Sequence, residues 1–182
     1  MRILSRMRRR HIIVSGIPAS GKSTVGRAIA EALGFEMFDK DEILEELFNT
    51  RGVGDVDWRR SLSRTADEIL RERASQAESS VIVSWWRHPA SSLATGTPVD
   101  WLTNLKGELI EVHCICNAAI ATQRFTTRKR HRGHLDQLKS SDDLLKTLEQ
   151  HASLGPLRIS RVVEVNTEGR VELAEVLSAI NA

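Results

Sequence analysis

Cysteine is scarce in this chain of 182 residues, which has only two, Cys114 and Cys116. They stand two positions apart in an apolar run that predicts a buried strand, and this spacing does not let the two thiols pair easily. No group of His and Cys residues has the spacing of a zinc site. We therefore expect both thiols to be reduced, which favours a cytoplasmic protein.

Long hydrophobic runs and an excess of charge of one sign are also lacking. No apolar stretch approaches the ~20 residues of a membrane span, so we expect no membrane partner. The chain has 26 Lys and Arg against 24 Asp and Glu, and a net charge of +2 does not by itself indicate nucleic acid. The basic residues 1–10 lack the apolar segment of a signal peptide. We expect a solvated leader there, with polyanion binding as the alternative.

The pattern of apolar residues predicts an α/β fold in one domain over residues 1–182. Hydrophobic residues make up 41% and charged residues 27%, which is typical of globular proteins. Short apolar runs alternate with longer amphipathic ones, as in a parallel sheet covered by helices. The expected strands are 11–15, 35–39, 80–85, 108–116 and 162–166, and the expected helices are 22–33, 40–48, 57–76, 118–129, 141–151 and 170–180.

A complete G-x-x-x-x-G-K-S phosphate loop lies between the first expected strand and helix. Backbone amides of such a loop cradle phosphates, Lys22 reaches the β- and γ-phosphates, and the Ser23 hydroxyl holds Mg²⁺. A chance Gly-rich turn is the alternative, and the strand and helix on either side disfavour it. Residues 166–169 are expected beside this loop, on the adenine side, and an ordinary turn without a contact to the base is the alternative. The residues expected to contact the nucleotide here are Gly16, Ile17, Pro18, Ala19, Ser20, Gly21, Lys22, Ser23 and Thr24.

Two carboxylates, Asp39 and Asp41, follow the second expected strand. One of them can lie near Mg²⁺, and we assign that place to Asp39. The other can accept a proton from a substrate hydroxyl, and we assign that role to Asp41. The alternative is that either residue only caps the next helix, which is common at such positions.

The third expected strand ends in the run Trp85, Trp86, Arg87. Tryptophan faces suit sugars or aromatic rings, and a guanidinium can anchor a substrate. The alternative is that a tryptophan packs into the core beneath the sheet edge. We expect one ring to be buried, one to line an acceptor pocket, and Arg87 to hold the acceptor.

A basic segment over residues 124–140 follows the fourth expected strand. Arg124 and Arg128 stand four apart and should share one helix face, and Gly133 should free the backbone for a mobile lid. Such a lid would exclude water and stabilise charge on the phosphoryl group. The alternatives are a solvated helix end or a nucleic-acid patch. The sequence disfavours nucleic acid, because Phe125 stands alone and offers no series of stacking rings.

Together these motifs resemble the small P-loop kinases, which include shikimate kinase, gluconate kinase, chloramphenicol phosphotransferase and the zeta-toxin-like kinases. The run Lys40-Asp41-Glu42-Ile43 and the segment Arg130-His131-Arg132-Gly133-His134 are similar to a zeta-toxin-related branch labelled AAA-family ATPase. The resemblance extends from the first expected strand to the last expected helix.

The resemblance implies a three-layer sandwich around a five-stranded parallel sheet in the order 2-3-1-4-5. It also implies MgATP as the phosphoryl donor, Asp41 as the base that engages the acceptor hydroxyl, and Asp39 in the magnesium shell. The loop after the third expected strand lacks the glycine triplet of shikimate kinases, which disfavours shikimate as the acceptor. Acceptor signatures of gluconate and nucleotide kinases are also missing.

We therefore expect an ATP-dependent phosphotransferase that acts on a hydroxyl of a small sugar-, cyclitol- or antibiotic-like molecule. Lys22, Asp41 and Arg128 are its expected catalytic residues. A polynucleotide or nucleotide-sugar kinase is one alternative, and a nucleotide hydrolase or switch is another. An Asn-Lys-x-Asp element and an Asp-x-x-Gly after the third strand are lacking, which argues against a switch. Both a monomer and a homodimer fit the sequence.

Overall fold

Five parallel strands form one sheet in the order β2-β3-β1-β4-β5, in a computed structural model that describes residues 9–92 and 94–182. This order confirms the predicted topology. The predicted leader lies almost entirely in residues 1–8, outside the described residues. The strands are β1 (Arg10–Ser15), β2 (Glu36–Asp39), β3 (Ser80–Val83), β4 (Glu108–Ile115) and β5 (Arg161–Asn166).

The helices follow the predicted order, with differences at their ends. The helix predicted over 118–129 ends at Thr127, and the last helix begins at Leu173 instead of residue 170. No helix within the described residues has the length and apolarity that a bilayer span requires. The helices are α1 (Lys22–Leu33), α2 (Lys40–Arg51), α3 (Val56–Gln76), α4 (Ala118–Thr127), α5 (Ser141–Leu154) and α6 (Leu173–Asn181), with short 3₁₀ turns at Leu102–Asn104, Arg132–His134 and Asp136–Leu138.

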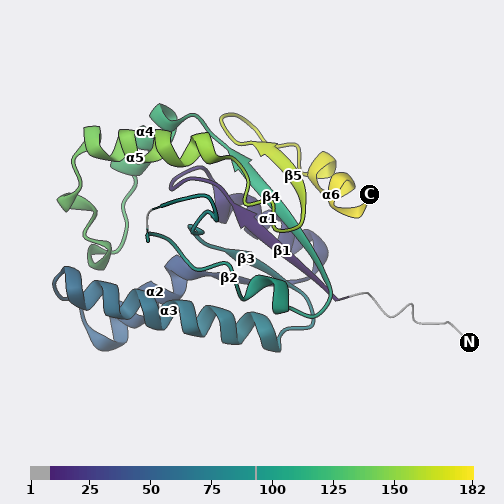
Figure 1. The fold of residues 1–182 in the computed structure, drawn as a ribbon, viewed down its shortest axis with the longest axis horizontal. Coiled ribbons are helices and arrows are strands. Elements are labelled where there is room, and N and C mark those ends of the chain that lie inside the picture. The colour runs from purple at the N-terminus through teal and green to yellow at the C-terminus, as the bar shows by residue number, and fades with distance from the viewer. Residues whose placement is uncertain (1–8, 93) are drawn as a thin grey trace, which may run out of the picture.

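Two apolar clusters cover the two faces of the sheet, because its side chains alternate between them. Ile12 and Val14 of β1 pack with α1 and α6 on one face. Ile13 of the same strand packs with α2 and α3 on the other face. Figure 1 shows α2 and α3 running side by side along one side of the molecule.

A third cluster joins α4 and α5 to the loop that follows β1. Phe125 of α4 and Leu144 and Leu148 of α5 pack with Ile17 of that loop. In the view of Figure 1, α4 and α5 run along the top of the molecule, and α2 and α3 run along the bottom. Parallel strands end at one edge of the sheet, so the loops after β1, β2 and β3 and the start of α4 meet there.

A fully buried carboxylate, Glu111 of β4, holds the chain between α5 and β5. Its Oε1 accepts hydrogen bonds from the Ser15 hydroxyl (2.6 Å) and the Leu157 amide (2.8 Å). Its Oε2 accepts one from the Arg158 amide (2.9 Å). Buried charges are tolerated where donors surround them, and these three donors come from two different segments. Glu111 thereby fixes where α5 ends relative to the sheet.

We expect Glu111→Ala to lower the free energy of unfolding by about 3 kcal/mol, because three buried donors would lose their acceptor. Urea unfolding followed by circular dichroism measures this change. The control is Glu164→Ala on the neighbouring strand β5, where the side chain is exposed and the change should stay within about 0.5 kcal/mol. Equal loss in both variants would contradict the role assigned to Glu111.

Candidate functional site

The loop between β1 and α1 has the backbone shape of an anion-binding nest. Ala19 and Gly21 both have left-handed φ values, 62° and 87°. Gly16 approaches β4 so closely that a Cβ on it would lie 2.6 Å from the Cys114 carbonyl oxygen. Successive amides in such a turn point toward one centre, and the N-terminus of α1 begins there at Lys22. The loop can therefore hold phosphate groups.

Lys22 is the buried cation of this loop. Its Nζ donates a 2.7 Å hydrogen bond to the Ile17 carbonyl. Burial lowers the pKa of Lys22 to about 8, although the nearby Asp41 and Asp39 act in the opposite direction. A bound phosphate would favour the charged form of Lys22 further, because it brings negative charge into the same space.

Two oxygen ligands suited to Mg²⁺ stand together where α1 begins and β2 ends. The Ser23 hydroxyl donates to Asp39 Oδ2 at 2.5 Å. Asp39 Oδ1 also accepts the Asp41 amide at 2.9 Å and so caps α2. Burial raises the pKa of Asp39, and a cation beside it would reverse that effect. A hydroxyl and a carboxylate are the hard ligands that Mg²⁺ prefers, so the residues present fit this ion.

Asp41, in the first turn of α2, faces the same space. Its Oδ2 accepts a hydrogen bond from Arg130 Nη2 at 2.5 Å, and 52% of its side-chain surface stays accessible. Burial among the cavity walls raises the pKa of Asp41, but Arg130, His134, Lys22 and Arg128 together outweigh it, and the net effect lowers the pKa. The carboxylate is therefore ionised at neutral pH and able to accept a proton.

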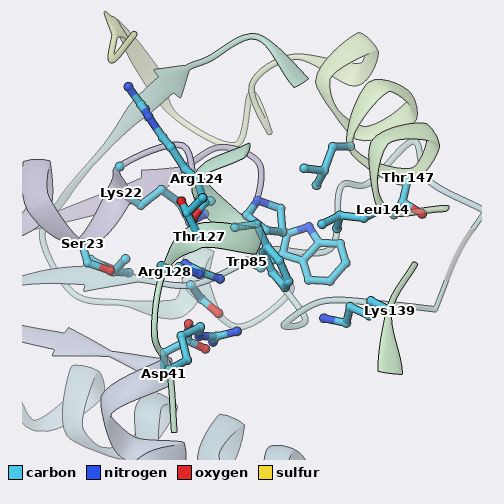
Figure 2. Close-up of a pocket in the computed structure, with 18 of the residues that line it drawn as sticks. Lys22, Ser23, Asp41, Trp85, Arg124, Thr127, Arg128, Lys139, Leu144 and Thr147 are labelled. Atoms are coloured by element: carbon cyan, nitrogen blue, oxygen red, sulfur yellow. The ribbon is translucent and has the colours of Figure 1, made fainter. Parts of the chain in front are cut away.

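A cavity of about 740 Å³ is lined by these groups and by residues of α4 and α5. In the view of Figure 2, Trp85 lies between Lys22 and Ser23 on one side and Leu144, Thr147 and Lys139 on the other. Such a volume accommodates a nucleotide tail and a small second substrate. The charged side chains that line it are Lys22, Arg59, Arg124, Arg128, Arg130 and Lys139, against Asp39, Asp41 and Asp143.

Two guanidinium groups of this cavity have buried nitrogens without partners. Within the described residues, neither Nε of Arg59 nor Nε of Arg128 has a hydrogen-bond partner. Burial lowers the pKa of each, and Arg130 lowers it further. A buried donor without an acceptor is costly, and an anionic ligand would supply the acceptor. The cavity is thus suited to negatively charged molecules.

The two tryptophans and the arginine that follow β3 lie in different environments in the structure. Trp86 is buried and donates through Nε1 to the Val14 carbonyl at 2.9 Å, whereas Trp85 lines the cavity. Trp86 therefore belongs to the core and not to the acceptor pocket. The expectation for Arg87 is corrected as well, since Arg87 does not line the cavity. Its Nη2 donates to the carbonyls of Ala94 (3.1 Å) and Gly96 (3.4 Å), because the loop folds back beside it.

The basic segment also differs from its predicted form. Arg128 lies just beyond the end of α4 in an extended conformation, so it does not share a helix face with Arg124, although both reach the cavity. Gly133 has an ordinary φ and no hinge geometry. It is needed for close packing, because a Cβ there would lie 2.5 Å from the Phe48 ring.

Arg124 and Thr167 tie the loop after β5 to the site. Arg124 Nη2 donates to the carbonyls of Thr167 and Glu168, both at 3.0 Å. The Thr167 hydroxyl donates to the Ser20 carbonyl at 2.6 Å. The loop over residues 166–169 therefore contacts the phosphate loop, as predicted, while its approach to adenine stays a prediction.

Three cavity residues, Arg59, Arg130 and Lys139, were not predicted. Arg59 lies in the first turn of the long helix α3. A basic residue at such a position is ordinarily solvated, so the sequence did not single it out. Arg130 and Lys139 fell within the basic segment but without roles. Only the clustering of cations in residues 124–134 pointed toward Arg130, and that signal does not choose among neighbouring side chains. Lys139 lies beyond this cluster.

Comparison with known proteins agrees with this geometry. Residues 12–152 match the family described as AAA domain. The chain belongs to this family. This confirms the resemblance to P-loop small-molecule kinases related to shikimate and gluconate kinases.

Individual relatives match over different lengths. The chain is 26% identical to the shikimate kinase of Rhodococcus erythropolis, over 87% of this chain and 88% of that enzyme. It is 42% identical to the shikimate kinase of Actinobacillus pleuropneumoniae serotype 5b, but over only 28% of this chain and 27% of that enzyme.

Solved structures share the fold. A protein from Chloroflexus aurantiacus superposes with a TM-score of 0.72 at 22% identity, over 96% of both chains. A gluconokinase from Sinorhizobium meliloti gives a TM-score of 0.51 at 23% identity, over 94% of this chain and 89% of that one.

The lowered pKa of Lys22 predicts how nucleotide affinity depends on pH. We expect the Kd of MgATP to rise as pH increases through about 8, because Lys22 then loses the charge that attracts phosphates. Isothermal titration calorimetry between pH 7 and 9.5 measures this dependence. Lys22→Ala should bind more weakly at pH 7 and lose the dependence. The same rise in Kd in that variant would contradict the assignment.

Proposed function

We propose that this protein is an ATP-dependent phosphotransferase that moves the γ-phosphate of MgATP to a hydroxyl group of a small molecule. The observation that carries this proposal is the position of Asp41. Its ionised carboxylate faces the same cavity as the phosphate loop, and Lys22 lowers its pKa from across that space. Phosphoryl transfer requires both parts, a cradle for the triphosphate and a group that orients the attacking oxygen.

The chemistry is a displacement at the γ-phosphorus. The acceptor oxygen forms a bond to phosphorus as the bond from phosphorus to the β,γ-bridging oxygen breaks, and ADP leaves. The hydroxyl proton passes to Asp41. Lys22 and Arg128 stabilise negative charge on the transferred group and on ADP. A magnesium ion held by Ser23 and Asp39 would offset phosphate charge.

The low pKa of Asp41 suits this reaction. A loose transition state leaves most of the proton on the acceptor oxygen until late, so the carboxylate acts mainly by orienting the hydroxyl. A group that is ionised at neutral pH is always ready to accept that hydrogen bond. Arg124, in the last turn of α4, serves the nucleotide by holding the loop after β5.

The acceptor side of the cavity indicates a hydroxylated molecule that also carries an anionic group. Arg59 is half-buried, lines the cavity from α3, and its Nε has no hydrogen-bond partner within the described residues. A carboxylate or phosphate on the acceptor would satisfy this nitrogen. Trp85 offers a ring face to the rest of the molecule, as expected for a sugar or cyclitol.

Acceptor-stimulated release of ADP tests the proposed function. We expect a library of hydroxylated metabolites to contain compounds that stimulate ADP release from MgATP, and Asp41→Asn to lower the stimulated rate by about 10²–10⁴-fold. MgATP affinity should stay nearly unchanged in Asp41→Asn, because the carboxylate contacts the acceptor and not the cradle. A coupled assay and calorimetry measure the two quantities. Turnover that no acceptor stimulates would favour a hydrolase instead.

Arg59→Gln tests the anionic group of the acceptor. With a stimulating acceptor that carries a carboxylate or phosphate, we expect KM for that acceptor to rise about tenfold or more, since a charge-assisted hydrogen bond is lost. KM for MgATP should not change. The matched control is Arg60→Gln, the next residue on α3, whose exposed side chain pairs with Asp57. Equal acceptor KM values in both variants would argue against Arg59 as the anchor.

A further inference from the structure

The segment after α4 lies along one face of α2, where three residues meet it. Asp41, Glu45 and Phe48 are spaced i, i+4 and i+7, so they line one stripe of the helix. Arg130 contacts the first of them, and His134 contacts the second at 2.9 Å, Nε2 to Oε1. The stripe therefore runs from the Asp41 carboxylate at the cavity to Phe48 near the C-terminal end of α2.

Phe48 is enclosed by the turn over residues 131–134. The His131 ring stacks on it with centroids 5.3 Å apart and planes 15° apart. The His134 ring meets it edge-on at 5.4 Å and 88°. Gly133 lies between them so close to the phenyl ring that any side chain would collide. We call Phe48, His131, Gly133 and His134 the aromatic clamp.

Polar contacts fix the register of the clamp. His131 Nδ1 accepts the Gly133 amide at 3.1 Å, which leaves Nε2 to donate to Asn49 Oδ1 at 3.2 Å. His134 is almost completely buried, with 1% of its surface exposed. A turn held by two ring contacts and two hydrogen bonds to α2 cannot slide along the helix without losing several of them.

Arg130 precedes the clamp and is held between two carboxylates. Its Nη2 donates to Asp41 Oδ2, and its Nη1 donates to Asp136 Oδ2 at 3.1 Å. Only 13% of its side chain is exposed, so water screens these charges little. A guanidinium fixed on both sides constrains the direction in which the Asp41 carboxylate points.

We propose that Arg130 is the positioning residue for Asp41, and that the aromatic clamp on α2 sets the place from which Arg130 acts. This inference rests on the proposed function, in which Asp41 is the reacting carboxylate. In this role Arg130 acts through Asp41 and does not contact the transferred phosphoryl group. The segment that the sequence suggests as a mobile lid is, at its root, a fixed support for the base.

Charged and titratable groups from several elements face Asp41. Lys22 of α1, Arg128 and Arg130 beyond α4, and His134 of the clamp all favour its ionised form. Asp39 of β2 opposes them, because each carboxylate disfavours the charge on the other. Of the cations, Arg130 has the largest effect.

Carbon-13 NMR of the aspartate carboxyl groups tests the proposal in the full chain without an acceptor. The Asp41 signal is assigned by its loss in Asp41→Asn. At a fixed pH of about 7.5, we expect its chemical shift to change in Arg130→Gln because the hydrogen bond from the guanidinium is lost, to recover most of that change in Arg130→Lys, and to stay in place in Arg132→Gln. Arg132 is the matched control, because it is an exposed cation of the same turn.

Gly133→Ala tests whether the clamp acts through Arg130. The new methyl group would collide with Phe48, far from Asp41, and should change the Asp41 chemical shift in the same direction as Arg130→Gln does. Combined with Arg130→Gln it should add little further change, since the hydrogen bond that transmits the effect is already removed. An unchanged chemical shift in Arg130→Gln, or additive changes in the double variant, would overturn the proposal. Melting curves of each variant confirm that it is folded before the measurement.

The measurement separates this inference from the proposed function. If no acceptor stimulates ADP release while the chemical shift changes as described, Arg130 still positions Asp41 and only the reaction is misassigned. With a stimulating acceptor, Arg130→Gln should lower kcat about tenfold or more and leave KM for MgATP unchanged, whereas a loss of folding would lower the active fraction without changing the Asp41 signal of the folded protein.

Discussion

The hydrogen bond between Ser23 and Asp39 joins the two halves of the site. One oxygen of Asp39 receives the hydroxyl at the start of α1, and the other receives the Asp41 amide at the start of α2. A single buried side chain thus sets the position of the phosphate loop relative to the helix that carries Asp41. The apolar faces of both helices pack on the sheet and hold the two ends of this connection.

Electrostatic imbalance distinguishes the cavity from an ordinary surface cleft. Six cations and only three carboxylates of the described residues line it, and the Nε atoms of Arg59 and Arg128 have no acceptor there. Burial lowers the pKa of Lys22 and of both arginines, which means that it disfavours their charged forms. A bound polyanion would favour these charged forms again. Binding energy from phosphate groups is available because folding alone does not satisfy these side chains.

Prediction from the sequence succeeded where one local segment determines the outcome. The phosphate loop, the order of elements and the strand order could all be derived or recognised, since they depend on turn chemistry, periodicity and a shared motif. The role of Trp86 and Arg87 could not, because adjacent side chains after a strand point in directions that the returning loop decides. Gly133 was misread for a similar reason, since the need for glycine comes from the Phe48 ring of a distant helix.

The sequence by itself determined the fold class, through the alternation of apolar and amphipathic runs along the chain. It also determined the phosphate loop and the pair of carboxylates after β2, because each of these is written in a few consecutive residues. Only the tertiary structure decided which cations share the cavity with them. Arg59 and Arg130 are more than 70 positions apart along the chain and come from different elements. Both lie near Asp41 because α3 packs on α2 and the turn after α4 packs against the stripe of Asp41, Glu45 and Phe48 on α2. These contacts arise from packing between elements that are distant in the sequence, and no local sequence pattern predicts such packing.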